Sequence, residues 1–351
     1  MVGGENRQLR PPQRFASVPI PEPPWEPAWD APPHGPGFVV TRLTTLTVSA
    51  CVRRGLEILT GAGIESPRAD AEWLLAWCLG VRRMQLYLEL DRELNEAQQA
   101  RFESLLHRRA AREPLQHLLG SAEFYGRSFE VNRSVLIPRP ETELLAELSV
   151  RHLKKRFGAD QCSSPPTNHL ERPLKALDYG TGSGCLAITL ALEMPPEMVV
   201  EISALDISPD ALEVARRNSR RHGCEQAVRF LEGNGFAALG STSLGAGGFD
   251  LIVANPPYIP TGEIEGLEPE VRDHDPVLAL DGGSDGLDFF RHLASHAPVR
   301  LLSGGVLMAE FGDGQFESIA ALFRSESWIV DEPAKDDTGR PRFLIARPAA
   351  S

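Results

Sequence analysis

The sequence has little cysteine and no long hydrophobic run. Its cysteines are odd in number and form no CxxC pair: Cys51, Cys78, Cys162, Cys185 and Cys224. This arrangement argues against a disulfide framework and against a metal site, and it fits a reducing cytoplasm. No run of eighteen apolar residues occurs, so we expect neither a membrane-spanning helix nor a membrane partner. The first residues carry no apolar stretch after their charges, which is unlike a secretory signal.

Positive charge is also scarce. The 36 lysines and arginines are outnumbered by 48 aspartates and glutamates, which gives a formal net charge of −12. Nucleic-acid backbones are bound mainly by Lys and Arg that displace counterions. We therefore expect no direct nucleic-acid binding, although a local basic groove is compatible with this composition. The length of 351 residues predicts about two domains.

Residues 1–40 form a proline-rich extension with ten prolines. Proline fixes φ and removes a backbone donor, so this stretch is expected to be disordered. A proline-rich docking ligand is the alternative. A further hypothesis places the biological start of the protein near Val40, where helix-like sequence begins.

Residues 41–120 are expected to form a small helical domain. Apolar residues recur at helical spacing over 48–59. Asn95 with Gln98 three residues later is typical of a capping box. Aromatic residues such as Trp73 are expected to pack in the core between these helices.

The pattern changes after a short linker at 121–135. A central glycine between aromatic flanks at 123–131 predicts a hairpin. Residues 136–351 then alternate apolar strands with helices, which indicates an α/β domain with a doubly wound, mostly parallel sheet. The expected strands are 174–178, 199–206, 228–231, 250–254, 305–310 and 343–346. Polar loops rich in Gly, Pro and Ser interrupt the domain at 159–173 and 240–248.

A glycine-rich turn, DYGTGSG, occupies residues 178–184 between a predicted strand and a helix. Glycines let the backbone turn sharply and approach a ligand closely, and the helix beyond offers free N–H groups. Asp206 ends the next strand, where a carboxylate can accept both hydroxyls of a ribose. Together these features predict a nucleoside cofactor. The alternative is a tight turn that only packs a helix on a sheet.

The glycine spacing distinguishes between cofactors. Dinucleotide sites usually show G-x-G-x-x-G, whereas the spacing here is G-x-G-x-G. Asp178 before the turn would repel a pyrophosphate but would suit a cationic amino-acid moiety. The combination resembles the class I S-adenosylmethionine methyltransferases, whose ligand carries a sulfonium and an α-ammonium group. That resemblance implies a seven-stranded sheet and S-adenosyl-L-methionine as the cofactor.

The segment Asn255-Pro256-Pro257-Tyr258 directly follows a predicted strand. It resembles the motif of methyltransferases that act on nitrogens conjugated to a π system. Such a nitrogen is a poor nucleophile because its lone pair is delocalised. The Asn255 side-chain oxygen and the Pro256 carbonyl can accept its two hydrogens, and the prolines stiffen the loop. The alternative is a proline turn that merely ends a strand.

Four segments, one of which extends the Asn-Pro-Pro-Tyr segment, make the resemblance specific to one family. They are LIPRPETE at 136–143, NPPYI at 255–259, ALDGGSDGLDFF at 279–290 and DDTGRPR at 336–342. With the glycine turn they resemble the HemK/PrmC family of release factor glutamine N5-methyltransferases over residues 46–347. The resemblance implies methylation of the glutamine amide in the GGQ motif of class I peptide chain release factors. It also implies that the helical domain helps to dock the factor.

The resemblance implies a role for each motif residue. Those expected to line the methionine part of the cofactor are Gly180, Thr181, Gly182, Ser183 and Gly184. Asp206 should hold the ribose, and Asn255 should contact both cofactor and glutamine. Three further residues are expected to hold the glutamine together with Asn255: Pro256, Pro257 and Tyr258. The expected catalytic residues are Asn255, Pro256 and Tyr258. Arg139 and Glu141 are expected to cap the substrate site, and a structural ion pair is the alternative for them.

The chain also departs from the family pattern. Asn234-Gly235-Phe236 stands where Asp-Trp-Phe is common, so Asn234 and Gly235 are expected to wall the adenine without the tryptophan's packing surface. His117 replaces a common tyrosine, and we interpret it as a partly exposed histidine at a helix end. Phe311 stands in place of an aliphatic residue.

Three other functions remain alternatives. A nucleic-acid amino methyltransferase would share the Asn-Pro-Pro-Tyr chemistry, but it usually carries a basic groove or a target-recognition domain. An NAD-dependent oxidoreductase disagrees with the glycine spacing. A catalytically inactive scaffold is disfavoured because Asn255 and Asp206 are both present.

Overall fold

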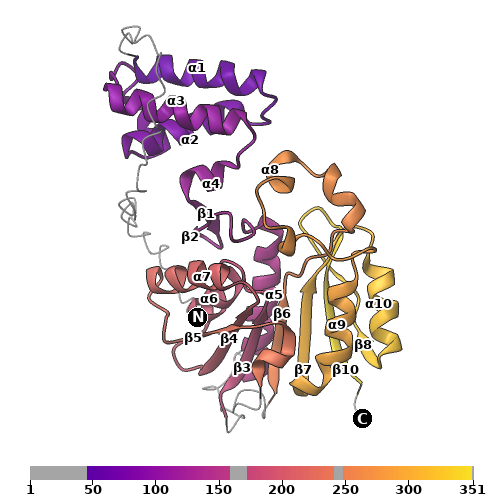
Figure 1. The fold of residues 1–351 in the computed structure, drawn as a ribbon. Coiled ribbons are helices and arrows are strands. Elements are labelled where there is room, and N and C mark those ends of the chain that lie inside the picture. Colours follow the sequence, from indigo (N-terminus) through magenta and orange to yellow (C-terminus); the bar gives the residue numbers. More distant parts are fainter. Residues whose placement is uncertain (1–45, 159–171, 241–247, 350–351) are drawn as a thin grey trace, which may run out of the picture. The chain divides into compact units, whose positions relative to one another are not determined.

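The computed structural model describes residues 46–158, 172–240 and 248–349 (Figure 1). The chain divides between Ala110 and Ala111 into two compact units. The predicted extension at 1–40 and most of the two predicted polar loops lie outside the described residues.

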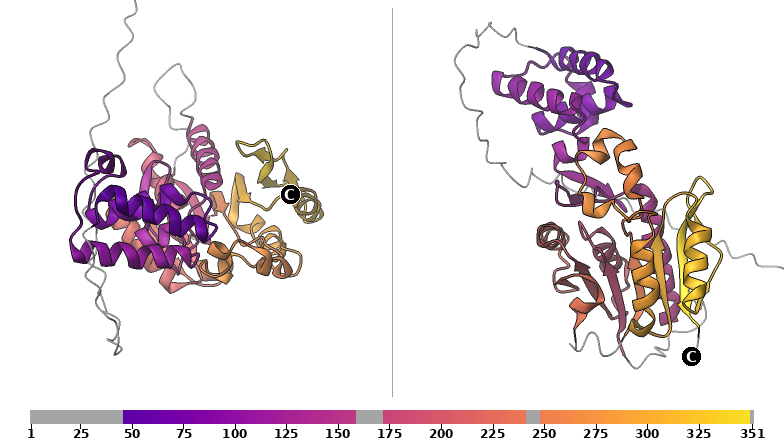
Figure 2. Two further views of the ribbon diagram at one scale, coloured as in Figure 1. Left: turned by 90° about the horizontal axis from the view of Figure 1, so that it is seen from above. Right: turned by 45° about the vertical axis from the view of Figure 1, so that its right-hand side comes forward.

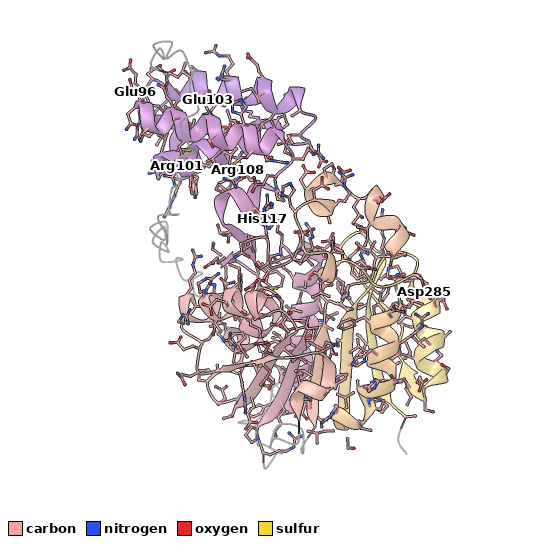
Figure 3. The ribbon with its side chains drawn as sticks, in the orientation of Figure 1. Glu96, Arg101, Glu103, Arg108, His117 and Asp285 are labelled. Atoms are coloured by element: carbon pink, nitrogen blue, oxygen red, sulfur yellow. The ribbon has the colours of Figure 1, made fainter. Side chains whose placement is uncertain are left out.

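The first unit is helical in its described part. Its elements are α1 (Val48–Gly61), α2 (Pro67–Leu79), the 3-10 helix η1 (Arg83–Leu88) and α3 (Glu96–Ala110). α1 and α2 pack closely at Gly55, where an added Cβ would lie 2.6 Å from the Cβ of Ala71. α3 begins with Glu96 and carries Arg108 in its last turn (Figure 3), which places each charge at the favourable end of the helix dipole.

Two sequence predictions in this unit have different outcomes. The capping box is confirmed: the Gln98 N–H donates to Asn95 Oδ1 at 2.8 Å, and the Asn95 N–H donates to Gln98 Oε1 at 3.1 Å. The prediction that Trp73 packs in the core is wrong, because its side chain is 44% exposed. The Arg83 guanidinium lies over the Trp73 ring, 5.7 Å from its centroid, which is a favourable cation–π contact at a surface.

The second unit contains the α/β fold. Its helices are α4 (Leu115–Leu119), α5 (Pro140–Phe157), α6 (Cys185–Glu193), α7 (Pro209–Arg221), α8 (Pro269–Arg272), α9 (Asp288–His296) and α10 (Phe316–Ser325), with 3-10 turns η2 (Gly235–Leu239), η3 (Thr261–Gly266), η4 (Val277–Ala279) and η5 (Pro298–Arg300). Its strands are β1 (Ser121–Phe124), β2 (Arg127–Glu130), β3 (Leu174–Tyr179), β4 (Val200–Asp206), β5 (Val228–Glu232), β6 (Phe249–Ala254), β7 (Leu301–Glu310), β8 (Trp328–Val330), β9 (Ala334–Lys335) and β10 (Pro341–Pro348).

The central sheet has the order β5-β4-β3-β6-β7-β10-β8, with the two-residue β9 paired to β10. Neighbours from β5 to β7 are parallel, and β10 runs antiparallel to β7, β8 and β9. The prediction of a doubly wound, mostly parallel sheet of seven strands is confirmed along this path, and β9 is an added short strand. The predicted hairpin is also confirmed: β1 and β2 pair around Tyr125 and Gly126, both at positive φ.

Helices cover both faces of the sheet. α5 and α6 bury side chains such as Leu145 and Ile188 against one face. α9 (orange) and α10 (yellow) lie side by side on the other face (Figures 1 and 2), where Phe290 and Phe323 are fully buried. No helix among the described residues is both long and apolar enough to span a bilayer.

The strand order places a switch point beside β3. The chain moves from β3 to β4 and β5 in one direction and then returns to add β6 on the other side of β3. The connections therefore diverge at the carboxyl ends of β3 and β6, which leaves a crevice there. In open α/β sheets ligands bind in such a crevice.

Candidate active site

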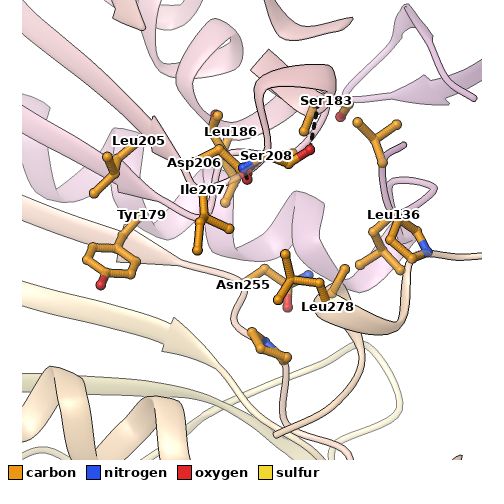
Figure 4. A pocket seen from close by; sticks show the side chains of 18 of the residues that line it. Leu136, Tyr179, Ser183, Leu186, Leu205, Asp206, Ile207, Ser208, Asn255 and Leu278 are labelled. Atoms are coloured by element: carbon orange, nitrogen blue, oxygen red, sulfur yellow. Dashed lines mark hydrogen bonds between the residues drawn. The ribbon is translucent and has the colours of Figure 1, made fainter. Parts of the chain in front are cut away.

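A cavity of about 410 Å³ opens at this edge of the second unit. Tyr179 ends β3, Asp206 ends β4 and Asn255 follows β6, so the carboxyl ends of three strands contribute to its wall. Figure 4 shows Asp206 and Asn255 on two sides of the same hollow. Predicted site residues that line it are Arg139, Gly180, Thr181, Gly182, Ser183, Asp206, Asn234, Gly235, Asn255 and Pro257. Those that do not are Glu141, Gly184, Pro256 and Tyr258.

The glycine turn needs its glycines for two different reasons. Gly180 and Gly182 have φ values of +80° and +53°, and an added Cβ would meet nothing within 4 Å. Their requirement is therefore conformational, and the backbone stays open toward the cavity. Gly184 has φ +82°, and its added Cβ would lie 3.1 Å from the Cβ of Ala215 on α7. Gly184 therefore allows α6 to pack against α7.

Asp206 is held in place by backbone donors. The Gly182 N–H donates to its Oδ2 at 2.8 Å, and the Ser208 N–H donates to its Oδ1 at 2.9 Å. Each carboxylate oxygen still has a lone pair that can accept from another donor. The carboxylate is thus oriented at the cavity wall and able to take two hydroxyl hydrogens.

Asp178 supports the turn from behind. Its side chain is fully buried, and Oδ2 accepts from the Thr181 hydroxyl at 2.6 Å and from the Ala187 N–H at 3.1 Å. Burial raises the pKa of this carboxyl to about 7. Its Oδ1 is buried without a hydrogen-bond partner among the described residues, and the expectation that Asp178 suits a cationic ligand group stays a prediction.

The surroundings of Gly235 leave no room for a side chain at this position. An added Cβ on Gly235 would lie 2.9 Å from His292 Nε2 and 3.0 Å from the Tyr179 hydroxyl oxygen. His292 stacks on Phe236, and Tyr179 packs edge-on against Phe289 with ring centroids 5.2 Å apart. Tyr179 and Phe289 both line the cavity. Sequence reasoning missed both, although each lies inside a quoted motif.

The Asn-Pro-Pro-Tyr loop is tied to two distant elements. The Asn255 Nδ2 donates to Thr142 Oγ1 at 3.0 Å, and the Thr142 hydroxyl donates to Glu310 Oε2 at 2.7 Å. The Tyr258 hydroxyl donates to Glu310 Oε1 at 3.3 Å. Thr142 lines the cavity and was not singled out in the sequence.

The remaining atoms of this loop are also constrained. Pro256 is buried, and Gln315 Nε2 donates to the Tyr258 carbonyl oxygen at 2.8 Å. Burial and the neighbouring Glu310 raise the pKa of the Tyr258 hydroxyl, which keeps it neutral. The loop therefore presents Asn255 and Pro257 to the cavity from a supported backbone.

Arg139 both lines the cavity and forms an ion pair. It precedes α5, and its Nη2 donates to Asp275 Oδ2 at 2.8 Å. Burial raises the pKa of the Asp275 carboxyl to about 6, while Arg139 opposes that rise. Of the two residues for which the sequence left a structural ion pair open, Arg139 forms one, with Asp275 as its partner, and this pair holds Arg139 at the cavity wall.

His117 and Phe311, which the sequence analysis also singled out, do not line the cavity. His117 belongs to α4 (Figure 3), and neither ring nitrogen has a hydrogen-bond partner among the described residues. Burial lowers its pKa to about 4, so the imidazole is neutral. The interpretation of a partly exposed histidine at a helix end is confirmed, because the side chain is half-buried in the last turn of α4, although its two ring nitrogens are buried. Phe311 is fully buried in the core beside Phe316.

The cavity has the features that a nucleoside cofactor requires. An oriented carboxylate, an open glycine turn and aromatic walls surround one apolar hollow. Among the described residues, no group of three or more His, Cys, Asp or Glu side chains is arranged to hold a metal ion. The Asn-Pro-Pro-Tyr loop after β6 adds a group that can hold a nitrogen to be methylated. The protein is therefore an S-adenosylmethionine-dependent methyltransferase.

Comparison with known proteins agrees with this class and refines it. Residues 50–120 match the family described as PrmC N-terminal domain, and residues 170–281 match the family described as methyltransferase domain. A release factor glutamine methyltransferase from Geobacter sulfurreducens is 42% identical over 289 residues, covering 82% of this chain and 92% of the relative. One from Deinococcus radiodurans is 40% identical over 291 residues, covering 83% and 95%. The chain belongs to the release factor glutamine methyltransferase family.

A methyltransferase from Pyrococcus furiosus is 21% identical, with a TM-score of 0.40, over 64% of this chain and 91% of that chain.

Proposed function

We propose that this protein transfers a methyl group from S-adenosyl-L-methionine to the side-chain amide nitrogen, N5, of the glutamine in the GGQ motif of class I peptide chain release factors. The observation that carries the proposal is that Asn255 lines the same cavity as Asp206 and the glycine turn. A group that can hold an amide thus lies in the same hollow as a group that can hold a nucleoside. The named activity of the relatives supports the choice of substrate.

The chemistry follows from the weakness of the nucleophile. An amide nitrogen has a delocalised lone pair, so it must be held with that lone pair directed at the electrophile. The Asn255 Oδ1 and the Pro256 carbonyl are the two acceptors we assign to its hydrogens, and Tyr258 braces the loop that carries them. Positioning of this kind can contribute roughly 7–11 kcal/mol of barrier reduction. When bound, S-adenosylmethionine supplies an electrophilic methyl group, and the products are N5-methylglutamine, S-adenosylhomocysteine and a proton.

The cofactor is assigned to residues along the strand ends. For the methionine part we propose Gly180, Thr181, Gly182 and Ser183, with Gly184 supporting the turn. Asp206 accepts from the ribose hydroxyls. For the adenine we propose the wall formed by Tyr179, Asn234, Gly235 and Phe289. Arg139, which directly precedes α5, caps the side where the glutamine enters, and Glu141 lies in the first turn of α5.

The helical unit has a separate proposed role. We assign it to docking of the release factor. The net charge of −12 supports a protein substrate over a nucleic acid, because a polyanion repels phosphate backbones. The reaction is then expected in the cytoplasm, where release factors act.

The test is methyl transfer from labelled S-adenosylmethionine to the purified release factors of the host. A matched factor with the GGQ glutamine replaced by alanine is the control, and a third reaction contains host RNA and DNA. We expect label on the factor that disappears when the glutamine is replaced. Label that persists on the altered factor would contradict the assigned nitrogen, and label only on nucleic acid would contradict the protein substrate.

A further inference from the structure

An asparagine amide can point either of its two ends at a ligand. Its oxygen accepts hydrogen bonds and its nitrogen donates them, while the two ends have nearly the same shape. In the proposed reaction only the oxygen of Asn255 can accept from the substrate amide. A contact within the protein must therefore fix which end of the Asn255 amide faces the cavity.

The hydrogen bonds of Thr142 fix the orientation of the Asn255 amide. A threonine hydroxyl has one hydrogen to donate, and Thr142 donates it to Glu310 Oε2 at 2.7 Å. Its oxygen is then left to accept, which it does from Asn255 Nδ2 at 3.0 Å. With the nitrogen of Asn255 committed to Thr142, the amide oxygen is the end that remains for the cavity.

Glu310 sets the direction of this chain of hydrogen bonds. Its side chain is 1% exposed and accepts from both Thr142 and Tyr258. If the Asn255 amide were reversed, its oxygen would face an oxygen whose hydrogen is already used. A buried polar atom without a partner is costly, so the reversed orientation is disfavoured.

The sheet register brings these groups together. β6 and β7 are parallel neighbours in which Ala254 pairs with Ala309. Asn255 and Glu310 each follow one of these paired residues, so they lie at the same level of the sheet edge. Thr142 reaches them from the first turn of α5. The three groups are far apart in the chain, and no single motif contains them all.

We propose that Thr142 and Glu310 are positioning residues that fix the amide of Asn255 with its oxygen toward the substrate. The inference rests on the proposed role of Asn255 in holding the glutamine amide. Glu310 also holds Tyr258, so one buried carboxylate orients both ends of the Asn-Pro-Pro-Tyr loop.

The test compares two substitutions at one position in the full-length enzyme. Thr142→Val keeps the shape of the side chain and removes the hydroxyl, whereas Thr142→Ser keeps the hydroxyl. We expect Thr142→Val to lower kcat for release-factor methylation at least tenfold. Thr142→Ser should stay within about threefold of the unchanged enzyme. The Kd for S-adenosylmethionine, measured by calorimetry, should change less than twofold in both variants.

A double-mutant cycle separates positioning from a general structural role. In an Asn255→Ala background, Thr142→Val should lower the single-turnover rate less than twofold further, because the group that it orients is already absent. A tenfold further loss in that background, or a matching rise in the Kd for S-adenosylmethionine, would overturn the inference. So would a Thr142→Val enzyme with kcat within twofold of the unchanged enzyme.

The stability of the variant is checked separately. Each variant is melted first, and if Thr142→Val shows no cooperative transition, Thr142→Ala takes its place with the same expected results. The proposed function fails in a different way. In that case the unchanged enzyme would itself leave the release factor unlabelled or would label the factor whose GGQ glutamine is replaced, whatever Thr142 does.

Discussion

The backbone N–H of Gly182 donates a 2.8 Å hydrogen bond to the carboxylate of Asp206. This contact joins the glycine turn after β3 to the end of β4 across two adjacent strands. The carboxylate therefore orients the turn at the same time as it faces the cavity. Loss of Asp206 should affect the cofactor through both effects.

Asp206→Ala should weaken the binding of S-adenosylmethionine at least tenfold. Each hydrogen bond to a charged group contributes roughly 1.5–3 kcal/mol, and the proposed ribose contacts would be removed. Calorimetric titration measures the Kd directly. Asp210→Ala, which removes an exposed acid from the first turn of α7, is the matched control and should leave the Kd unchanged. An Asp206→Ala enzyme with the same Kd as that control would show that the ribose is held elsewhere.

Asn255→Ala should lower release-factor methylation at least a hundredfold and leave the fold intact. The substitution removes the acceptor that holds the substrate nitrogen, and it leaves Thr142 Oγ1 with one donor fewer. The rate is measured with labelled cofactor at saturating factor, beside a thermal melt of the same sample. Activity within threefold of the unchanged enzyme would rule out the role assigned to Asn255.

Gly235→Ala should lower the stability of the second unit more than Gly223→Ala does. Both glycines have positive φ, +68° and +66°, so backbone strain of roughly 1–2 kcal/mol is common to the two variants. Only at Gly235 would the new Cβ press on His292 and Tyr179, and overpacking costs about 1–3 kcal/mol in addition. Urea unfolding followed by tryptophan fluorescence compares the two. Equal losses would show that the aromatic wall yields to the extra methyl group.

Asp178→Asn should make stability less dependent on pH. Burial raises the pKa of Asp178 from 3.8 to about 7 in the folded protein. Between these two values the folded state binds more protons than the unfolded state, so this carboxyl lowers stability as the pH rises from 4 to 7. Asparagine does not titrate, and its oxygen can still accept from Thr181. The fall in Tm between pH 5 and pH 8 should therefore shrink by several degrees, and an unchanged fall would mean that Asp178 does not titrate in this range.

The main strands were predictable because each is a short apolar run with its own boundaries. The expected strand at 250–254 lies within β6, and the one at 228–231 lies within β5. β7 begins at Leu301, before the predicted start at 305. The prediction missed the first residues of the strand because Ser303 and two glycines interrupt the apolar pattern there. The two-residue β9 has no signal of its own, since it depends on pairing with β10.

The candidate site was partly predictable. Gly180, Gly182 and Asp206 act through backbone conformation and through their position at strand ends, both of which a motif records. Tyr179 and Thr142 line the same cavity but were not singled out. A tyrosine or a threonine fits many environments, and only its neighbours in the fold give it a role.

The class of fold, the glycine turn and the amide-bearing loop follow from local sequence patterns alone. Periodicity, positive-φ glycines and prolines act over a few residues, so their effects can be recognised locally. Three features are visible only in the folded molecule. Trp73 is exposed, and His292 and Tyr179 occupy the space beside Gly235. The Asn255 amide is hydrogen-bonded to Thr142, which is hydrogen-bonded in turn to Glu310. These outcomes depend on side chains that are distant in the chain and meet only after the sheet has formed, and no local pattern records such a meeting.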